Sequence, residues 1–397
     1  MRTIILAIIL IVSFSISASA EQKDFIELGV KGYSLVYDTK FDEANKIFDE
    51  MIKMKPDNAL GYLLKSRSYL LRLAFGTNDD EYIEKFEKTS FQAAKIAEEM
   101  LDKNKNDVDA LFYLGGIYGY LGYYYGSQKS YFKAIRYGRK GVNYLEKAIE
   151  KDPEYYDAYL GFGLYHYLIG SAPKSVRGIA SMLLGIKGDM KKGLEEMLLA
   201  SSKGKYLSDE AKYVLANQIY MGNEQNFEAA SNILKELISK YPNNGSFQMN
   251  LAMCYKNIKK YDEAITVLEE IYQKNPDDMN ISLQLGWTYL DSSQADKAFN
   301  TFEKIIEDNP EYAHGYYQIG RTSVISGQRL EEADKYFLKY LDMKQFKNNP
   351  SEAWAHFRLG QVYEMTGKIE QAKTQYKTAL KLDSKHKEAK EALKKIK

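Results

Sequence analysis

The chain has 397 residues, a formal net charge of +1 and 27% charged residues. This length is enough for a long repeat array or for two domains. The balanced charge gives no reason to expect a nucleic-acid partner. The single cysteine, Cys254, excludes a disulfide within the chain, and its apolar neighbours on a predicted helix indicate a small buried hydrophobe rather than a nucleophile.

Residues 1–20 have the pattern of a secretory signal peptide. Arg2 supplies positive charge, Ile4 to Ile16 form an apolar run, and Ala18-Ser19-Ala20 is a small-residue cleavage signature. The run is shorter than the roughly 20 residues that span a bilayer. No cysteine lies near the expected cleavage site, so a lipid cannot be attached there. We expect cleavage after Ala20 and a soluble protein that is periplasmic or secreted, with an uncleaved anchor as the alternative.

Residues 21–204 are predicted to form a divergent block of helical hairpins with insertions. A first hairpin at 25–58 is followed by two longer helices, 62–75 and 82–101. An insertion within 108–153 is rich in tyrosine and basic residues: Tyr120, Tyr123, Tyr124, Tyr125, Tyr131 and Tyr137, with Lys129, Lys133, Arg136, Arg139 and Lys140. Such a cluster could hold a sugar, a single-stranded nucleic acid or a peptide. We favour two lengthened helices with packed tyrosines and solvated lysines.

A short apolar helix is predicted between Pro173 and Gly188. It covers Val176 to Ile186, and its basic flanks are Lys174, Arg177, Lys187 and Lys191. It is too short to cross a membrane. We favour a plug packed on the inner surface of the array. A lid, or a peripheral contact of residues 174–191 with the envelope membrane, is the alternative.

Residues 205–384 are predicted to be a regular array, beginning after the polar break at 201–205. Met279 to Pro310 is its clearest unit, because Leu283, Gly286 and Leu290 follow helical spacing in its first helix. A glycine within a helix is tolerated where a second helix must come close, and Ala298 has the matching place on that second helix. The same marks recur at a shift of about 34 residues, so neighbouring hairpins bury each other's apolar stripes. Residues 385–397 form a lysine-rich capping helix.

This pattern resembles the tetratricopeptide repeat (TPR): Leu-Gly and then Tyr in the first helix, Ala, Phe and Ala in the second, and Pro at the join. The resemblance implies an all-α solenoid, a right-handed superhelix of helical hairpins, with helical insertions in the N-terminal half. Asp157-Ala158, the Gly-Leu-Tyr-His-Tyr run, the Ala-Pro insertion, Gly188-Asp189 and the following Lys-Gly-Leu-Glu-Glu are similar to divergent exported bacterial TPR proteins. They are more distantly similar to the eukaryotic TPR family containing a mitochondrial outer-membrane inclusion-clearance protein. This second resemblance covers residues 60–255 and implies no catalytic activity.

The exposed positions of each first helix line the concave side of TPR arrays. Applied to this sequence, the rule predicts a peptide-binding groove of Met249, Met253, Trp287, Tyr317, Arg321, Trp354 and Phe357. Large apolar and aromatic anchors of this kind dominate binding at protein interfaces. The alternative is that these side chains pack against the next hairpin or against the inserted helices. The paired lysines and asparagines of chaperone-tail-binding TPRs are absent and position 287 holds Trp, which argues against a carboxylate clamp.

Catalytic and metal-binding patterns are missing. The four histidines are far apart, and no His-Glu-x-x-His pair, calcium loop or Gly-x-Ser-x-Gly elbow occurs. We therefore expect no enzyme activity, metal or cofactor. The predicted function is a non-catalytic exported scaffold that binds a protein or peptide in its concave groove. The alternative is binding of a small molecule, glycan or lipid by the tyrosine-rich insertions, at Tyr120, Tyr124, Tyr165 and Met182.

Overall fold

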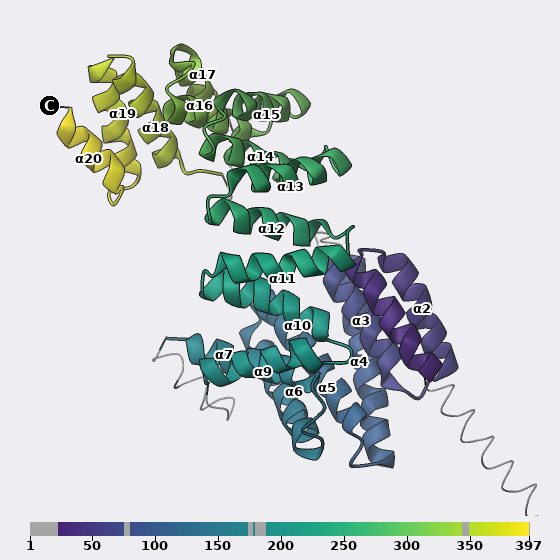
Figure 1. Ribbon diagram of the computed structural model, residues 1–397. Coiled ribbons are helices and arrows are strands. Elements are labelled where there is room, and N and C mark those ends of the chain that lie inside the picture. The colour runs from purple at the N-terminus through teal and green to yellow at the C-terminus, as the bar shows by residue number, and fades with distance from the viewer. Residues whose placement is uncertain (1–22, 75–79, 174–177, 179–187, 344–348, 397) are drawn as a thin grey trace, which may run out of the picture. The chain divides into compact units, whose positions relative to one another are not determined.

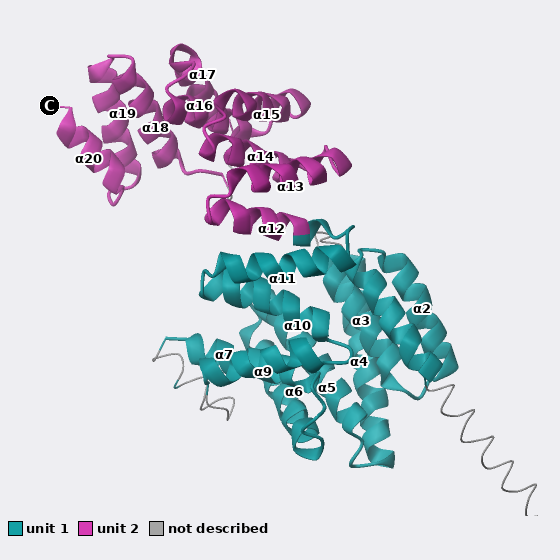
Figure 2. Ribbon diagram, viewed as in Figure 1, with its two compact units in different colours: residues 1–247 teal, residues 248–397 magenta. Residues whose placement is uncertain are grey.

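A computed structural model describes residues 23–74, 80–173, 178, 188–343 and 349–396. Throughout these ranges the regular structure is helical, without strands. Consecutive helices pair as antiparallel hairpins, so the predicted all-α solenoid class is confirmed (Figure 1). The chain divides into two compact units, residues 1–247 and 248–397 (Figure 2). The expected signal peptide and most of the expected apolar helix Val176 to Ile186 lie outside the described residues.

Unit 1 is built from helices that pack in chain order. A helix at residues 23–37 precedes α2 (Phe41–Met54), whose buried face is Ala44, Phe48 and Met51. The following elements are α3 (Ala59–Ala74), α4 (Asp80–Lys103), α5 (Val108–Ser127), α6 (Tyr131–Lys151), α7 (Ala158–Ser171), α9 (Met190–Lys203), α10 (Ser208–Val214), the π-helix η1 (Leu215–Asn223) and α11 (Phe227–Lys240). α3 packs on α4, α5 on α6, and α7 on α9.

The tyrosine-rich insertion is the extension of α5 and α6, as the favoured interpretation of the sequence has it, but Tyr123 and Tyr131 are exposed rather than packed. The two helices come close because glycines face each other. A Cβ on Gly122 would lie 2.9 Å from the nitrogen of Gly138, and one on Gly141 would lie 2.9 Å from the carbonyl oxygen of Gly115. No other residue permits this approach without displacing a helix. This close contact holds the C-terminal end of α5 beside the N-terminal end of α6, and the two ends form the tip of the hairpin.

The first hairpin of unit 1 contacts the segment that follows α11. The side-chain amide of Asn244 donates a hydrogen bond of 2.7 Å to the carbonyl oxygen of Tyr37. Asn243 donates to Asp38 over 3.0 Å. The Tyr37 ring also lies 5.4 Å from the ring of Tyr241. Unit 1 therefore closes on itself, and its first and last turns share one interface.

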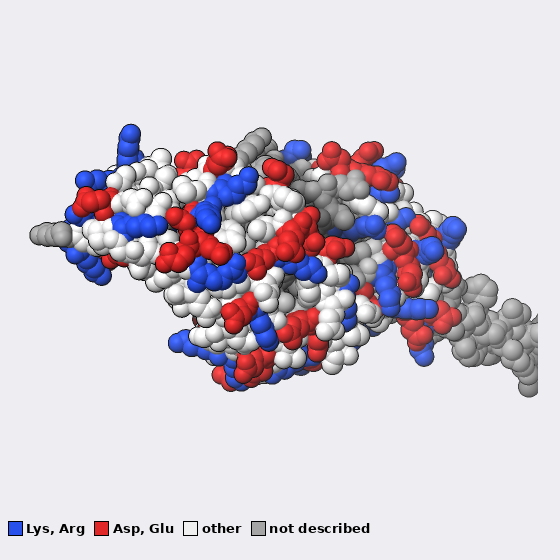
Figure 3. Space-filling view, turned by 90° about the horizontal axis from the view of Figure 1, so that it is seen from above, with Lys and Arg blue, Asp and Glu red and all other residues white. Residues whose placement is uncertain are grey.

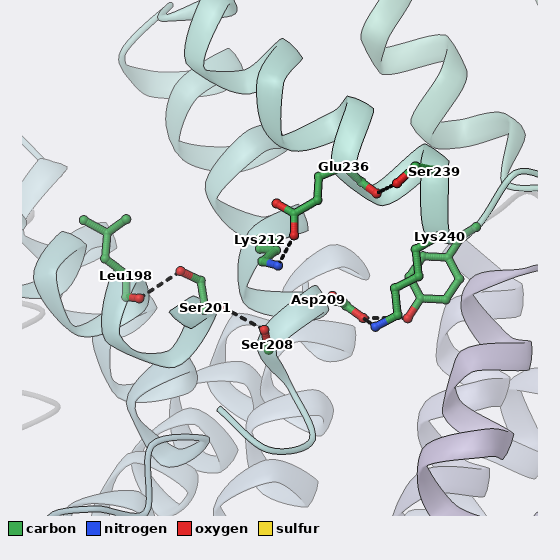
Figure 4. A network of polar contacts seen from close by, with 9 residues as sticks. Leu198, Ser201, Ser208, Asp209, Lys212, Glu236, Ser239 and Lys240 are labelled. Carbon is green, nitrogen blue, oxygen red and sulfur yellow. Dashed lines mark hydrogen bonds and ion pairs between the residues drawn. The ribbon is translucent and has the colours of Figure 1, made fainter. Parts of the chain in front are cut away.

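Polar contacts hold α9, α10 and α11 together (Figure 4). Ser208 donates from Oγ to the carbonyl oxygen of Ser201 over 2.7 Å, and Asp209 accepts hydrogen bonds from Lys240 and Tyr241. The Asp157 carboxylate accepts from the backbone N–H groups of residues 205, 206 and 207 at 3.0, 2.9 and 2.7 Å. The polar break at 201–205 consequently lies inside unit 1.

Unit 2 is a run of hairpins. Its helices are α12 (Gly245–Asn257), α13 (Tyr261–Lys274), α14 (Met279–Asp291), α15 (Ala295–Asp308), α16 (Ala313–Ser326), α17 (Leu330–Asp342), α18 (Glu352–Met365), α19 (Ile369–Leu382) and α20 (Lys387–Lys395). α12 starts at the end of unit 1 and continues into unit 2. A Cβ on Gly286 would lie 2.5 Å from a ring carbon of Phe302, so α14 approaches α15 as closely as the repeat pattern predicts. The terminal helix α20 packs against α19.

Candidate functional site

The predicted groove residues lie on the first helices of the hairpins in unit 2. Five of them are partly exposed and so remain available to a partner: Met249 and Met253 on α12, Trp287 on α14, Arg321 on α16 and Trp354 on α18. The expectation fails for Tyr317 and Phe357, which are each 5% exposed. A single position rule cannot separate these two groups, because burial depends on the neighbouring helices.

Tyr317 and Phe357 are buried because each points toward the second helix of its own hairpin. The ring of Tyr317 lies 5.2 Å from that of Tyr340. The ring of Phe357 lies 5.7 Å from Tyr376 and 5.0 Å from His386. Both side chains therefore support the surface from beneath rather than lining it.

The two tryptophans are half-buried and held by their neighbours. Trp287 packs against the core around α14 and α15, with Lys256 Nζ 5.8 Å from its ring and the His314 ring 6.0 Å away. Trp354 lies 4.3 Å from the ring of His386, which caps α20. Rigid aromatic groups with one free edge offer apolar contact at a small cost in side-chain entropy.

Two arginines on the first helices, Arg321 and Arg358, form no ion pair in the part of the chain that the structure describes, and Arg358 Cζ lies 5.9 Å from the Trp354 ring. Arg321 Nη1 donates to Gln318 Oε1 over 3.4 Å, and Arg358 Nη1 donates to Gln361 Oε1 over 2.8 Å. Arg358 Nε is buried and has no hydrogen-bond partner there. Burial, together with the charge of Arg358, lowers the pKa of Arg321. The sequence reasoning missed Arg358; its place four residues after Trp354, without an adjacent acid, was the available signal.

His314 lies near Trp287, with its ring 6.0 Å from that of the tryptophan. Its Nε2 lies 2.7 Å from Nε2 of Gln318. Burial, and then the nearby charge of Arg321, lowers the pKa of His314 from 6.5 to about 4. The imidazole is consequently neutral near pH 7 and accepts the hydrogen bond from the amide. The positive charge of this surface therefore resides on Arg321 and Arg358.

The residues predicted as an alternative ligand site are distributed over α5 and α7. Tyr120 lies under the guanidinium of Arg67, whose Cζ is 4.5 Å from the ring centre. Tyr124 is buried 5.2 Å from the ring of Phe86. The hydroxyl of Tyr165 is buried without a hydrogen-bond partner among the described residues, and burial raises its pKa. Met182 lies outside the described residues. The first two tyrosines thus contact different parts of the unit 1 core.

A buried ion pair that the sequence reasoning missed lies in the core of unit 1. Glu210 on α10 accepts hydrogen bonds from Arg67 on α3 and from Tyr33 in the first hairpin. Glu210 and Tyr33 are buried, and the Arg67 side chain is 12% exposed. Burial and then the charge of Glu210 raise the pKa of Tyr33. This cluster pairs its own charges, so its role is to join distant helices.

The described residues contain no group of three or more histidine, cysteine or acidic side chains that could hold a metal ion. Burial raises the pKa of Cys254 to about 11, so its thiol stays protonated near neutral pH. None of the helices placed by the structure is both long and apolar enough to cross a bilayer. Acidic and basic side chains are interspersed on the face shown in Figure 3. That face therefore lacks the one-sign field that attracts a polyelectrolyte.

The helical hairpins correspond to known repeat families. Residues 223–271, 259–319 and 353–386 match models of the tetratricopeptide repeat. The predicted TPR character is therefore confirmed. Residues 36–246, more than half of the chain, match the model described as Regulator of microtubule dynamics protein 1-3. No curated protein matches the chain.

Several solved structures of repeat proteins are similar to parts of the chain. MamA, from residue 41 to its end, of Desulfovibrio magneticus RS-1 is 21% identical, with a TM-score of 0.37 over 44% of this chain and 97% of its own. A tetratricopeptide repeat protein from Parabacteroides merdae ATCC 43184 is 15% identical, with a TM-score of 0.45 over 76% and 98%. YrrB, a TPR protein with an unusual peptide-binding site, is 19% identical, with a TM-score of 0.38 over 51% and 99%. Because the family match spans most of unit 1, the chain belongs to the Regulator of microtubule dynamics protein 1-3 family, with tetratricopeptide repeats forming its C-terminal array.

Proposed function

We propose that the protein is a non-catalytic scaffold that binds a polypeptide segment on the first helices of unit 2. The bound segment carries a carboxylate, from an acidic side chain or from a chain end. The observation that supports this proposal is the pair of partly exposed arginines, Arg321 and Arg358, which have no carboxylate partner in the described residues. They lie on the helices that also carry the predicted groove residues.

Desolvation of these arginines favours an acidic partner. A guanidinium that is largely removed from water loses hydration, and this burial lowers the pKa of Arg321. A carboxylate that bound there would restore the missing interaction through charge-assisted hydrogen bonds, which Arg can form in pairs. The Arg358 side chain is partly exposed, and its Nη groups would be the donors to that acceptor, because its Nε is buried. Trp287 would supply apolar contact area beside the charged group.

We also propose that the scaffold acts outside the cytoplasm. This rests on the N-terminal pattern of Arg2, the apolar run and the Ala18-Ser19-Ala20 signature. Its partner would then be an exported or envelope protein. N-terminal sequencing of the mature protein tests this part directly, because a mature chain that begins at Met1 would contradict export by cleavage.

Partner recovery with matched variants tests the binding surface. The mature chain is used to recover partners from extracts of the source cells, beside Arg321→Gln, Arg358→Gln and Trp287→Ala variants. Arg329→Gln is the matched control, since Arg329 pairs with Glu303 on an exposed surface. We expect each groove variant to lose a partner that the wild type and the control both retain. Equal recovery by all of the folded variants would contradict the proposal.

Peptides derived from a recovered partner then test the carboxylate. Replacing the acidic group by its amide should weaken binding about tenfold or more, as expected for the loss of a hydrogen bond between charged groups. The same replacement should have little effect on the Arg321→Gln, Arg358→Gln double variant. If the amide peptide bound the wild type as tightly as the acidic peptide does, the arginines would have no role in recognising the carboxylate.

A further inference from the structure

The tip of the α5–α6 hairpin concentrates positive charge in a chain that is nearly neutral overall. No aspartate or glutamate occurs between residues 110 and 145, whereas five basic residues do: Lys129, Lys133, Arg136, Arg139 and Lys140. All five side chains are exposed. The net charge of the whole chain is only +1, so this stretch is a local excess rather than a reflection of composition.

The same tip exposes large aromatic side chains. Phe132 is 81% exposed, Tyr131 is 66% exposed and Tyr123 is 59% exposed. Tyr123 lies near the end of α5, and the other two lie in the first turn of α6, so the three belong to the same end of the hairpin. Among the described residues Phe132 is the most exposed large hydrophobic side chain. Single exposed apolar groups are ordinary, but adjacent aromatic groups among cations form a distinct surface.

Stacked tyrosines hold this surface in place. The Tyr137 ring is stacked 5.5 Å from Tyr125 and 5.9 Å from Tyr118. Lys133 Nζ lies 4.5 Å above the Tyr125 ring, and Lys140 Nζ lies 4.5 Å above the Tyr118 ring. Lys133 and Lys140 therefore lie over packed rings, whereas Lys129 lies in the turn between α5 and α6.

The acidic groups facing the stack from α4 do not neutralise these cations. Glu87 accepts a hydrogen bond from the hydroxyl of Tyr125, and Glu98 accepts one from Tyr118 over 3.0 Å. Within the described ranges, Lys129, Lys133 and Lys140 form no ion pair, although Lys140 Nζ donates to the hydroxyl of Tyr118 over 3.4 Å. The charge of Lys129 and Lys133 is consequently available to an external anion.

We infer that this tip, defined by Tyr123, Lys129, Tyr131, Phe132, Lys133 and Arg136, docks on a membrane surface rich in anionic phospholipid. Aromatic rings favour the boundary between headgroups and acyl chains, where an apolar body and a polar edge are both accommodated. Lysine and arginine beside them attract anionic headgroups. The combination of outward aromatic groups with unpaired cations matches that boundary better than it matches a polyanion without bases, such as heparin, which offers no apolar partner to the rings.

Vesicle flotation of the full mature chain tests the inference. One set of vesicles contains phosphatidylcholine and phosphatidylglycerol in equal amounts, and the other contains phosphatidylcholine alone. We expect binding to the anionic vesicles only, with an affinity that falls as salt is raised. Lys129→Gln and Arg136→Gln should each weaken binding about fivefold, the expected contribution of one cation at an anionic surface. A Tyr131→Ser, Phe132→Ser variant should weaken it further through loss of apolar contact.

Matched controls change similarly exposed residues elsewhere. Lys394→Gln and Lys395→Gln remove cations from α20, and Leu338→Ser removes an apolar group that is 49% exposed on α17. These controls should bind as the wild type does. Because Phe132 and Lys129 lie on the surface, the tip variants should keep the wild-type melting temperature, so that lost binding is not lost folding.

A Phe132→Trp variant supplies a second measurement. Its added emission should shift to the blue on anionic vesicles and be quenched by lipids brominated near the headgroup. Equal binding to both vesicle types, unchanged binding by the tip variants, or an unshifted emission would each overturn the inference. Tighter binding to a soluble polyanion such as heparin than to the anionic vesicles would also overturn it, because the surface would then serve a different class of partner.

Discussion

Asn244 donates its side-chain amide to the carbonyl oxygen of Tyr37, a residue 207 positions earlier, over 2.7 Å. Both groups are buried. The same Asn244 accepts hydrogen bonds at Oδ1 from the N–H groups of Ser246 and Phe247, where α12 begins. One side chain thus closes unit 1 and starts the next helix. If the first hairpin of unit 1 unfolded, the surface that it covers after α11 would become exposed.

Replacing Asn244 by alanine should lower the free energy of unfolding of unit 1 by about 1–3 kcal/mol, because the buried carbonyl of Tyr37 loses its donor. Chemical denaturation followed by circular dichroism measures this. The neighbouring Asn243→Ala change removes only exposed hydrogen bonds to Asp38 and should cost less than about 1 kcal/mol. Equal effects of the two variants would argue against closure as a source of stability.

Replacing Glu210 by alanine should destabilise unit 1 by about 3–5 kcal/mol, since it leaves the Arg67 charge buried without a partner. The Arg67→Met, Glu210→Leu double variant should recover part of that loss, because no charge then remains in the core. Glu236→Ala, which breaks an exposed ion pair with Lys212, should cost less than about 1 kcal/mol. If Glu210→Ala and Glu236→Ala lowered the free energy of unfolding equally, the buried pair would not be a larger source of stability than the exposed one.

The stability of unit 2 should decrease with acid through His314. The pKa of His314 is about 4 in the folded chain, whereas an unburied histidine has a pKa of 6.5. Between about pH 4 and pH 6.5 the unfolded chain therefore binds more protons at this residue than the folded chain does. The stabilising contribution is complete above pH 6.5 and is lost as the pH falls through about 4. We expect roughly 2 kcal/mol to be lost between about pH 7 and about pH 4.5.

Urea unfolding at the two pH values measures that loss. The His314→Gln variant should show a smaller loss on acidification, whereas His356→Gln, also on a first helix of the array, serves as the control. An unchanged pH dependence in His314→Gln would show that His314 is not the titrating group. Direct titration of the His314 ring by nuclear magnetic resonance gives the folded-state pKa independently.

Two glycines within helices should respond in opposite ways to replacement by alanine. Gly286→Ala should destabilise unit 2 by about 1–3 kcal/mol, since the new methyl group meets the Phe302 ring. Gly119→Ala in α5 should stabilise unit 1 by up to about 1 kcal/mol, because its Cβ meets open space and alanine favours the helix. Differential scanning calorimetry follows each change. A destabilised Gly119→Ala chain would contradict the packing described for α5.

Local spacing in the sequence determined the helical hairpins, because a single hairpin cannot bury both of its stripes and must lean on its neighbours. Leu283, Gly286 and Ala298 predicted the close approach of α14 and α15 from their positions alone. The tyrosine-rich insertion was likewise interpretable as two longer helices, since the helical period continues through it. These features depend on residues within one or two hairpins of each other.

Tertiary structure decided the features that depend on distant partners. The Arg67–Glu210 pair and the Asn244–Tyr37 bond join residues 143 and 207 positions apart, and no periodicity relates them. Whether Tyr317 supports the groove or lines it depends on how Tyr340 packs beneath it. Periodicity places a residue on a face of its own helix, but only the packing of neighbouring helices determines whether that face is covered, because burial and charge pairing arise between elements.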